Sequence, residues 1–257
     1  MRKRVYFLLI GLFLFNACQP APSSAGNPSP KTPLKETLIP AGSFTMGSDF
    51  GFPDEQPVHQ VPLEAYYIDT YEVTNAHYAE CVATSKCDAP AGSDSVTHGS
   101  YYGNAEFDNY PVIAVSWFNA ESYCAWRGAR LPTEAEWERA ARGPQPRSYP
   151  WGEGIDKTFA NYNTFVGDTT AVGSYESGKS VEGVYDLAGN VWEWVADWYN
   201  IYPGGDPAAS SDFGEKYRVM RGGGWQDLAD SVSATSRGWD EASFVNYHVG
   251  FRCARTP

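Results

Sequence analysis

Apolar and polar positions repeat with helical spacing in three short stretches of the chain. The first covers residues 74–84, and the second covers residues 117–127, with Ser116 as its cap and Gly128 after its end. The third opens on Thr133-Glu134-Ala135-Glu136, a capping box, and runs through residue 142 to a stop at Gly143. The spacing predicts three short helices.

Five shorter stretches rich in β-branched and aromatic residues predict strands. They cover residues 45–47, 66–69, 192–195, 218–221 and 249–253. Strands and helices do not alternate regularly, which argues against a parallel doubly wound sheet. No segment of 20–50 residues repeats, which argues against solenoids and propellers. The sequence therefore predicts a single compact α+β domain with much irregular structure.

Composition narrows the class of protein further. The 257 residues include 25 Gly, 18 Pro and 9 Trp, which favours short elements joined by many turns over a helical bundle or coiled coil. Asp and Glu number 31 against 19 Lys and Arg, a formal net charge of −12. Such a charge argues against nucleic acid as a partner, because binding to phosphates needs a cationic face.

The N-terminus has the layout of a lipoprotein signal peptide. Arg2, Lys3 and Arg4 precede an apolar run at residues 5–15, shorter than the ~20 residues that span a bilayer, and Cys18 follows. We interpret residues 1–17 as the signal, Cys18 as the lipidated residue and 18–36 as a flexible tether rich in Pro, Ser, Ala and Gly. Residues 37–257 would form the folded domain. The protein is then exported to the cell envelope or surface and held at the membrane by its lipid; an ordinary secretory signal with an incidental cysteine is the alternative.

Export also affects how the other four cysteines are interpreted. An even number in an oxidising compartment favours two disulfides. Cys81 and Cys87 are close in sequence, and Cys124 and Cys253 would then join the middle of the chain to its last strand. A redox or nucleophilic cysteine is the alternative, but no C-x-x-C occurs and no His adjoins any of the four.

Standard catalytic motifs are missing from the sequence. It has no H-E-x-x-H and no G-x-S-x-G, and the run 222–224 of three glycines lacks the Lys-Ser/Thr of a phosphate-binding loop. We expect this run to allow close backbone approach beside Trp225.

One segment, residues 185–194, suggests a calcium loop. Asp186 and Glu193 are hard oxygen ligands on either side of a glycine turn whose carbonyls could complete a Ca²⁺ site. The alternative is an Asx-type turn followed by a strand that packs Trp192 and Trp194 on one face.

Eight segments resemble, in the expected order, the formylglycine-generating enzyme (sulfatase-modifying factor) family. They are residues 39–48 (I-P-A-G-S-F-T-M-G-S), 69–75 (D-T-Y-E-V-T-N), 111–117, 130–142 (R-L-P-T-E-A-E-W-E-R-A-A-R), 150–152, 185–194, 218–225 and 250–253. The resemblance covers nearly all of residues 37–257 and implies a fold related to C-type lectins.

The resemblance also assigns residues to sites. Cys124 and Cys253 match a disulfide of the family. Structural calcium is implied at two sites, whose matching residues are Asp186, Gly189, Val191 and Glu193 at one, and Asn161, Tyr162 and Asp168 at the other.

A departure from the family pattern bears on mechanism. Active members bind copper through two cysteines after the G-G-S-[YW] segment and use oxygen to convert a sulfatase cysteine to formylglycine. Here the matching positions hold Asp227 and Val232, and the motif serine is Gly224. Soft Cu(I) needs thiolates, which hard oxygen ligands do not replace. We therefore expect no copper and no catalytic residues.

The sequence thus favours a non-catalytic binding or scaffolding lipoprotein that takes a protein or peptide ligand in the family's groove. Candidate ligand-binding residues lie in or near the segment 226–248: Trp225, Asp227, Trp239, Asp240, Phe244 and Tyr247. Variable proteins of diversity-generating retroelements resemble this fold, which makes a diversified binding protein a sharper version of the hypothesis. The alternative is an enzyme of the family that oxidises a sulfatase cysteine or carries out a related oxidase reaction.

Overall fold

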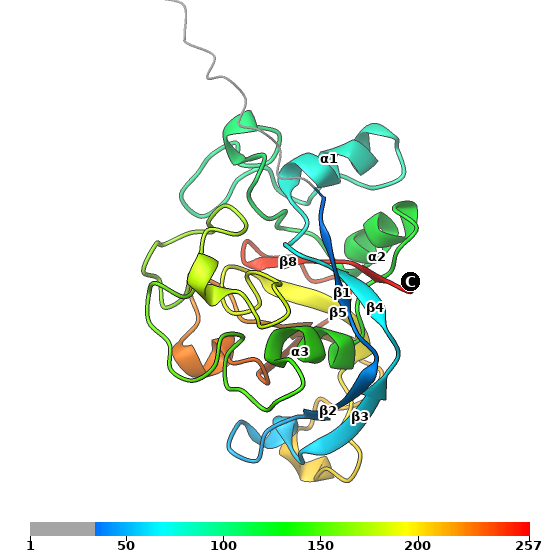
Figure 1. Ribbon diagram of the computed structural model, residues 1–257. Coiled ribbons are helices and arrows are strands. Elements are labelled where there is room, and N and C mark those ends of the chain that lie inside the picture. The colour runs from blue at the N-terminus through cyan, green and yellow to red at the C-terminus, as the bar shows by residue number, and fades with distance from the viewer. Residues whose placement is uncertain (1–33) are drawn as a thin grey trace, which may run out of the picture.

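A computed structural model describes residues 34–257, so the predicted signal peptide, Cys18 and most of the tether lie outside the described residues. The first strand, β1 (Glu36–Ile39), pairs with β4 (Tyr66–Asp69), which pairs with β9 (Ala254–Arg255). β2 (Gly42–Met46) and β3 (His59–Leu63) form a separate hairpin. Figure 1 shows this hairpin at one end of the molecule and α1 at the other.

The central sheet has four strands in the order β7-β6-β5-β8. These are β7 (Arg237–Asp240), β6 (Arg218–Arg221), β5 (Trp192–Trp198) and β8 (Val249–Phe251). β5 and β8 run parallel, and the other pairs are antiparallel. All five predicted strands are present in part, and β1, β3, β7 and β9 had not been predicted.

The three predicted helices are confirmed as α1 (Asn75–Ala83), α2 (Trp117–Trp126) and α3 (Glu134–Arg142). Each begins at the expected cap. At α3 the Thr133 hydroxyl accepts from the Glu136 amide at 3.1 Å, and the Glu136 carboxylate accepts from the Thr133 amide at 2.8 Å. This reciprocal pair satisfies two backbone donors that the helix start would leave unpaired. Short 3₁₀ turns at Pro53–Glu55, Ala105–Phe107, Glu176–Gly178, Pro207–Ala209 and Ala229–Val232 occupy part of the loops.

The core lies on both faces of the central sheet. Side chains alternate along β5, so Trp194 joins the cluster under α1 and α2 while Val195 joins the cluster under α3. Trp192 packs against the same cluster as Trp194. Both tryptophans therefore pack on one face of the strand, as the alternative interpretation of residues 185–194 expects. No helix within residues 34–257 is long and apolar enough to cross a membrane.

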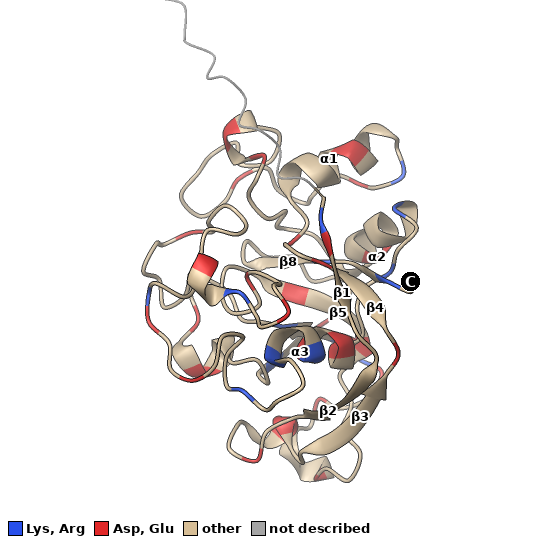
Figure 2. Cartoon of the chain, in the orientation of Figure 1, with Lys and Arg blue, Asp and Glu red and all other residues tan. Residues whose placement is uncertain are grey.

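A buried network of charges joins α3 to the sheet. Arg221, fully buried, contacts Glu134 at 3.0 Å and Glu138 at 2.6 Å. Arg237 contacts Glu134 at 2.7 Å, and Arg142 contacts Glu138 at 2.8 Å. Figure 2 shows that α3 carries both kinds of charge. Each of the two carboxylates thus has two arginine partners, so their burial is compensated.

Both expected disulfides form. Cys81 pairs with Cys87, six residues away, and Cys124 pairs with Cys253 across 129 residues. The second bond holds α2 to the segment between β8 and β9.

Removing the long-range disulfide is expected to cost much more stability than removing the short one. In the chain-entropy model, Cys124→Ala with Cys253→Ala should lower the free energy of unfolding by about 5 kcal/mol, and Cys81→Ala with Cys87→Ala by about 2 kcal/mol. Urea unfolding of the two double variants measures both values. Equal losses of unfolding free energy in the two variants would show that the length of the closed loop does not determine how much each disulfide stabilises the fold.

Candidate functional site

The site that matches the family's copper position begins where β6 ends, at the glycine run 222–224. Gly222 and Gly223 both have positive φ, at 92° and 71°. A Cβ on Gly223 would stand 2.6 Å from Cγ1 of Val232 and 2.7 Å from the Ser231 carbonyl oxygen. The expected role of this run in close backbone approach is confirmed, because the turn Ala229–Val232 packs directly on it.

Asp227, at the first copper-cysteine position, is a half-buried anchor. One of its carboxylate oxygens, Oδ2, accepts hydrogen bonds from the Trp192 indole at 2.7 Å and from the Gly224 amide at 2.8 Å. The carboxylate therefore ties the loop after β6 to β5. Beside it, Gln226 contacts Nδ1 of His248 at 3.1 Å, and burial lowers the pKa of that imidazole, an effect that Asp227 partly opposes.

Val232, at the second copper-cysteine position, is a core residue. It is fully buried in a cluster with Tyr149, Ala160, Tyr162 and Ala188. Every cysteine within residues 34–257 is in a disulfide, so this part of the chain has no thiol near either position. The described site offers oxygen and imidazole atoms, which suit neither a thiolate-bound metal nor thiol chemistry.

The first expected calcium set surrounds a buried ion pair. Glu193 receives two hydrogen bonds from Arg252, at 2.6 and 2.7 Å, and one from the Trp137 indole at 2.8 Å. Asp186 is also buried, has a positive φ of 59°, and accepts from the Gly173 amide at 2.7 Å. Burial raises the pKa of Asp186 to about 6.

A third carboxylate, Glu72, increases the negative charge in this region. Burial first, and then the charges of Asp186 and Glu193, raise the pKa of Glu72 well above its usual range. One of its oxygens, Oε1, has no hydrogen-bond partner, while the other accepts from Asn190 at 2.7 Å. Three buried carboxylates thus share the neighbourhood of one arginine, Arg252.

The second expected calcium set is divided between a satisfied carboxylate and an unsatisfied amide. Asp168 accepts hydrogen bonds from the Ser95 hydroxyl, the Thr97 amide and hydroxyl, and the Thr169 amide. Burial acts to raise its pKa, but these bonds hold the value below its usual range. The side-chain oxygen of Asn161 is buried without a hydrogen-bond partner.

A hard cation fits this region in charge and in unpaired oxygens. Such an ion would balance the negative charge of the carboxylates that Arg252 leaves uncompensated. It would also coordinate the oxygens of Glu72 and Asn161 that have no hydrogen-bond partner. No group of three or more His, Cys, Asp and Glu is arranged as a metal site in the part of the chain that the structure describes. The expected sets combine carboxylates with carbonyl and amide oxygens, including those of Gly189, Val191 and Tyr162, and calcium stays a prediction.

The candidate ligand-binding residues are not all together. Trp225 is buried beside Asp227, and its indole nitrogen has no hydrogen-bond partner. Trp239 stacks on Tyr199 at 4.2 Å and belongs to the cluster under α3, on the other face of the sheet. Phe244 packs against the cluster that contains Trp194, and Asp240 is half-buried at the end of β7. Tyr247 is exposed.

Sequence reasoning did not foresee the neighbours that complete this surface. The loop at residues 163–166 bonds to it, because the Asn163 amide donates to the Asp227 carbonyl and the Thr164 amide to the Trp225 carbonyl. Phe165, Val166 and Leu228 are each more than half exposed on these two loops. We call these three side chains the apolar rim. Only long-range pairing places the two loops together, so no local pattern could have shown it.

Comparison with known proteins gives one family. A family described as the sulfatase-modifying factor enzyme 1-like domain matches residues 22–257. The chain is 37% identical over 250 residues to the serine/threonine-protein kinase Pkn1 of Chlamydia trachomatis, covering 88% of the chain and 39% of the kinase. It thus spans about two fifths of the length of these first curated relatives.

Relatives closer to its own length include active and inactive members. The chain is 32% identical to a formylglycine-generating enzyme of Streptomyces coelicolor, covering 91% of the chain and 95% of the enzyme. It is also 32% identical to an inactive C-alpha-formylglycine-generating enzyme 2 of Bos taurus, covering 84% and 86%.

Two solved structures share the fold. Treponema denticola variable protein 1 has a TM-score of 0.69 and 25% identity, covering 87% of this chain and 95% of its own. PvdO of Pseudomonas aeruginosa has a TM-score of 0.67 and 32% identity, covering 86% and 93%.

Proposed function

Because the chain belongs to the formylglycine-generating enzyme (sulfatase-modifying factor) family, we propose that it is a non-catalytic member that binds a protein or peptide ligand. The observation that carries this proposal is the pair Asp227 and Val232 at the copper-cysteine positions. The Asp227 carboxylate accepts hydrogen bonds from the Trp192 indole and the Gly224 amide, and Val232 is buried in the hydrophobic core. Neither side chain can hold Cu(I), which the family's oxidation requires.

The apolar rim favours a binding role for the same face. Phe165, Val166 and Leu228 present exposed apolar area beside half-buried polar groups, a mixture that is typical of protein interfaces. The name of the inactive bovine relative is consistent with a family member that has lost catalysis and kept the fold.

A diversified binding protein is the second candidate. It is favoured by the similarity to Treponema denticola variable protein 1. Near-identical copies of the coding region for residues 220–252 beside a reverse-transcriptase gene would support it, and their absence would remove it.

We also propose that the protein is an exported lipoprotein anchored through Cys18. The basis is the order of the basic residues, the apolar run and the cysteine in residues 1–18. Mass spectrometry of the mature N-terminus would test it: a diacylated Cys18 is the expected first residue, and a retained Met1 would contradict the proposal.

Incubation with a C-x-P-x-R peptide, copper and oxygen should give no aldehyde. The physical reason is that the Asp227 and Val232 positions provide no thiolate pair to hold Cu(I) for oxygen activation. Peptide mass spectrometry measures the product, and an active formylglycine-generating enzyme run in parallel serves as the positive control. Aldehyde formation above the copper-only background would refute the non-catalytic assignment.

Calcium binding should stabilise the fold through the buried carboxylates around Arg252. For metal-loaded protein, EDTA should lower the melting temperature; a site occupied at a hundred times its Kd contributes about 3 kcal/mol. Asp186→Asn should remove the response to EDTA. Glu193 is unsuitable for this test because replacing it would leave the buried Arg252 guanidinium without its ion-pair partner.

Asp88→Asn, which alters an exposed carboxylate far along the chain from both sets, is the control and should keep the response. An identical melting curve with and without EDTA would contradict the calcium proposal.

A further inference from the structure

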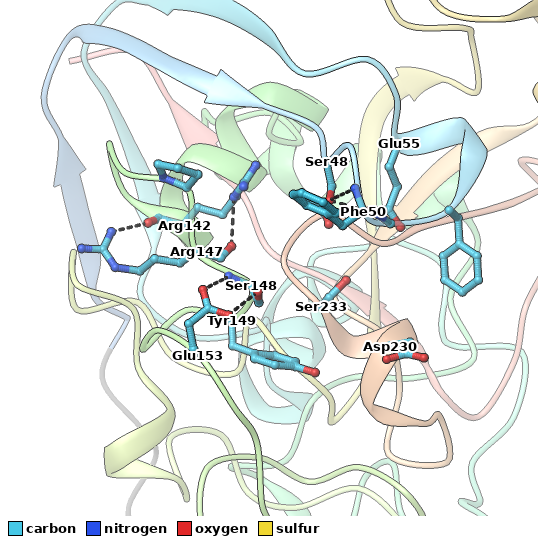
Figure 3. Close-up of a pocket in the computed structure, with 14 residues that line it drawn as sticks. Ser48, Phe50, Glu55, Arg142, Arg147, Ser148, Tyr149, Glu153, Asp230 and Ser233 are labelled. Atoms are coloured by element: carbon cyan, nitrogen blue, oxygen red, sulfur yellow. Dashed lines mark hydrogen bonds between the residues drawn. The ribbon is translucent and has the colours of Figure 1, made fainter.

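A cavity lies between the loop at residues 48–55, the end of α3 and the segment 230–235. Its volume is about 640 Å³. Figure 3 shows Glu55 reaching into it from the 3₁₀ turn Pro53–Glu55, with Ser233 and Asp230 below it in the view and Tyr149 on the facing side. The family-like function proposed above gives this cavity no role.

Glu55 is the unusual residue of this cavity. Its side chain is only 1% exposed, yet neither carboxylate oxygen has a hydrogen-bond partner. Among the described residues, it is the only carboxylate with both oxygens buried in this state. Burial raises its pKa, and the Thr235 hydroxyl, the Phe52 backbone and the charge of Arg221 offset this only in part. A buried carboxylate without a direct ion-pair partner is costly, so a missing cationic ligand would account for it.

The arginines that line the cavity do not supply that partner. Arg142 directs its guanidinium to Glu138 and to the carbonyls of Thr45 and Gly47. Arg147 donates to the carbonyl of Arg142 at 2.7 Å. Both guanidinium groups therefore donate to other protein acceptors, and neither forms an ion pair with Glu55.

Three aromatic side chains in the lining suit a flat organic cation. Phe50 is fully exposed and Phe52 nearly half exposed on the loop over Glu55, and Tyr149 also lines the cavity. Aromatic faces attract guanidinium groups, and two free carboxylate oxygens match the paired N–H donors of one guanidinium.

The loop at residues 49–52 covers the Glu55 carboxylate. A Cβ on Gly51 would stand within 2 Å of the Glu55 carboxylate, so the backbone of this loop lies directly on it. The Ser48 amide donates to the Glu55 carbonyl, and the Phe50 and Gly51 amides donate to the Ser48 hydroxyl. The loop is also held by a bond from the Val58 amide to Asp49 and by one from the Glu55 amide to the Phe52 carbonyl. Lifting residues 49–52 would expose the carboxylate at the loss of a few surface bonds.

We propose that this cavity binds the guanidinium of an arginine side chain in a protein partner, with Glu55 as its counterion and Phe50 and Phe52 closing over it. The inference extends the proposed binding role to a second place on the domain. It does not depend on the outcome of the aldehyde assay.

Calorimetry of the full-length protein with a short arginine peptide, its citrulline analogue and its lysine analogue tests the proposal. Citrulline keeps the shape of arginine without its charge, so its peptide should bind at least tenfold more weakly. The lysine peptide should also be weaker, because an ammonium cannot pair with both oxygens in one plane. Equal binding of the citrulline peptide, stronger binding of the lysine peptide, or no binding of arginine peptide at millimolar concentration would overturn the assignment.

Glu55→Gln is the matching protein variant. It removes an unpaired buried charge with little change in shape, so it should fold at least as stably as the parent while binding the arginine peptide at least tenfold more weakly. Glu153→Gln is the control, because that carboxylate lines the same cavity but is already bonded to Ser148. Unchanged affinity in Glu55→Gln, or equal losses in both variants, would contradict the role of Glu55.

Binding of free arginine amide distinguishes an arginine side chain of a protein partner from a small guanidinium compound as the ligand. Weaker binding of the amide than of the peptide supports a protein partner, whereas equal binding would contradict the protein partner and leave a small guanidinium compound as the ligand.

Discussion

The ion pairs between α3 and the central sheet are the constraint on which the rest of the fold depends. Arg221 is completely buried and is held by Glu134 and Glu138, which are themselves held by Arg237 and Arg142. Removing one member of such a set costs about 3–5 kcal/mol, because the remaining charge stays buried and unpaired. The network fixes where β6 ends. It thereby positions the glycine run and the turn that carries Asp227 and Val232.

The balance between buried charges and their partners differs between the copper position, the region around Arg252 and the cavity at Glu55. At the two copper-cysteine positions of the family, Asp227 accepts two hydrogen bonds and Val232 lies in the core. Around Arg252 and at Glu55, carboxylate charge exceeds the donors that the chain provides. Asp227 and Val232 are therefore structural residues, and the two unbalanced regions are where we propose cationic ligands, a hard cation in one and an organic cation in the other.

Local signals in the sequence were enough to predict the elements with strong end signals. The capping box at Thr133 and Glu136 and the cap at Ser116 define helices without reference to distant residues. The strands β1, β3 and β9 are short and pair with segments far away in the chain, so their own residues carry little information. The disulfides could be predicted because, with Cys18 set aside, four cysteines remain. Cys81 and Cys87 are close in sequence, which leaves Cys124 and Cys253 as the other pair.

The site was predictable only in part, for the same reason. The motif around residues 185–194 indicated Asp186 and Glu193, but the contribution of Glu72 and Arg252 depends on contacts across the fold. The isolation of Glu55 could not be inferred from a P-D-E-Q segment, because a missing partner is a property of packing. Trp239 shows the reverse case: a suggestive position in the groove segment whose side chain stacks on Tyr199, on the far face of the sheet.

The most direct test of the central claim is an anaerobic Cu(I) competition with a chromophoric chelator, using the folded protein with its two disulfides intact and Cys18→Ser to remove the remaining thiol. The account predicts that all Cu(I) passes to the chelator, because the groove has only hard oxygen and imidazole donors. Retention of one equivalent of Cu(I) by the protein would contradict it.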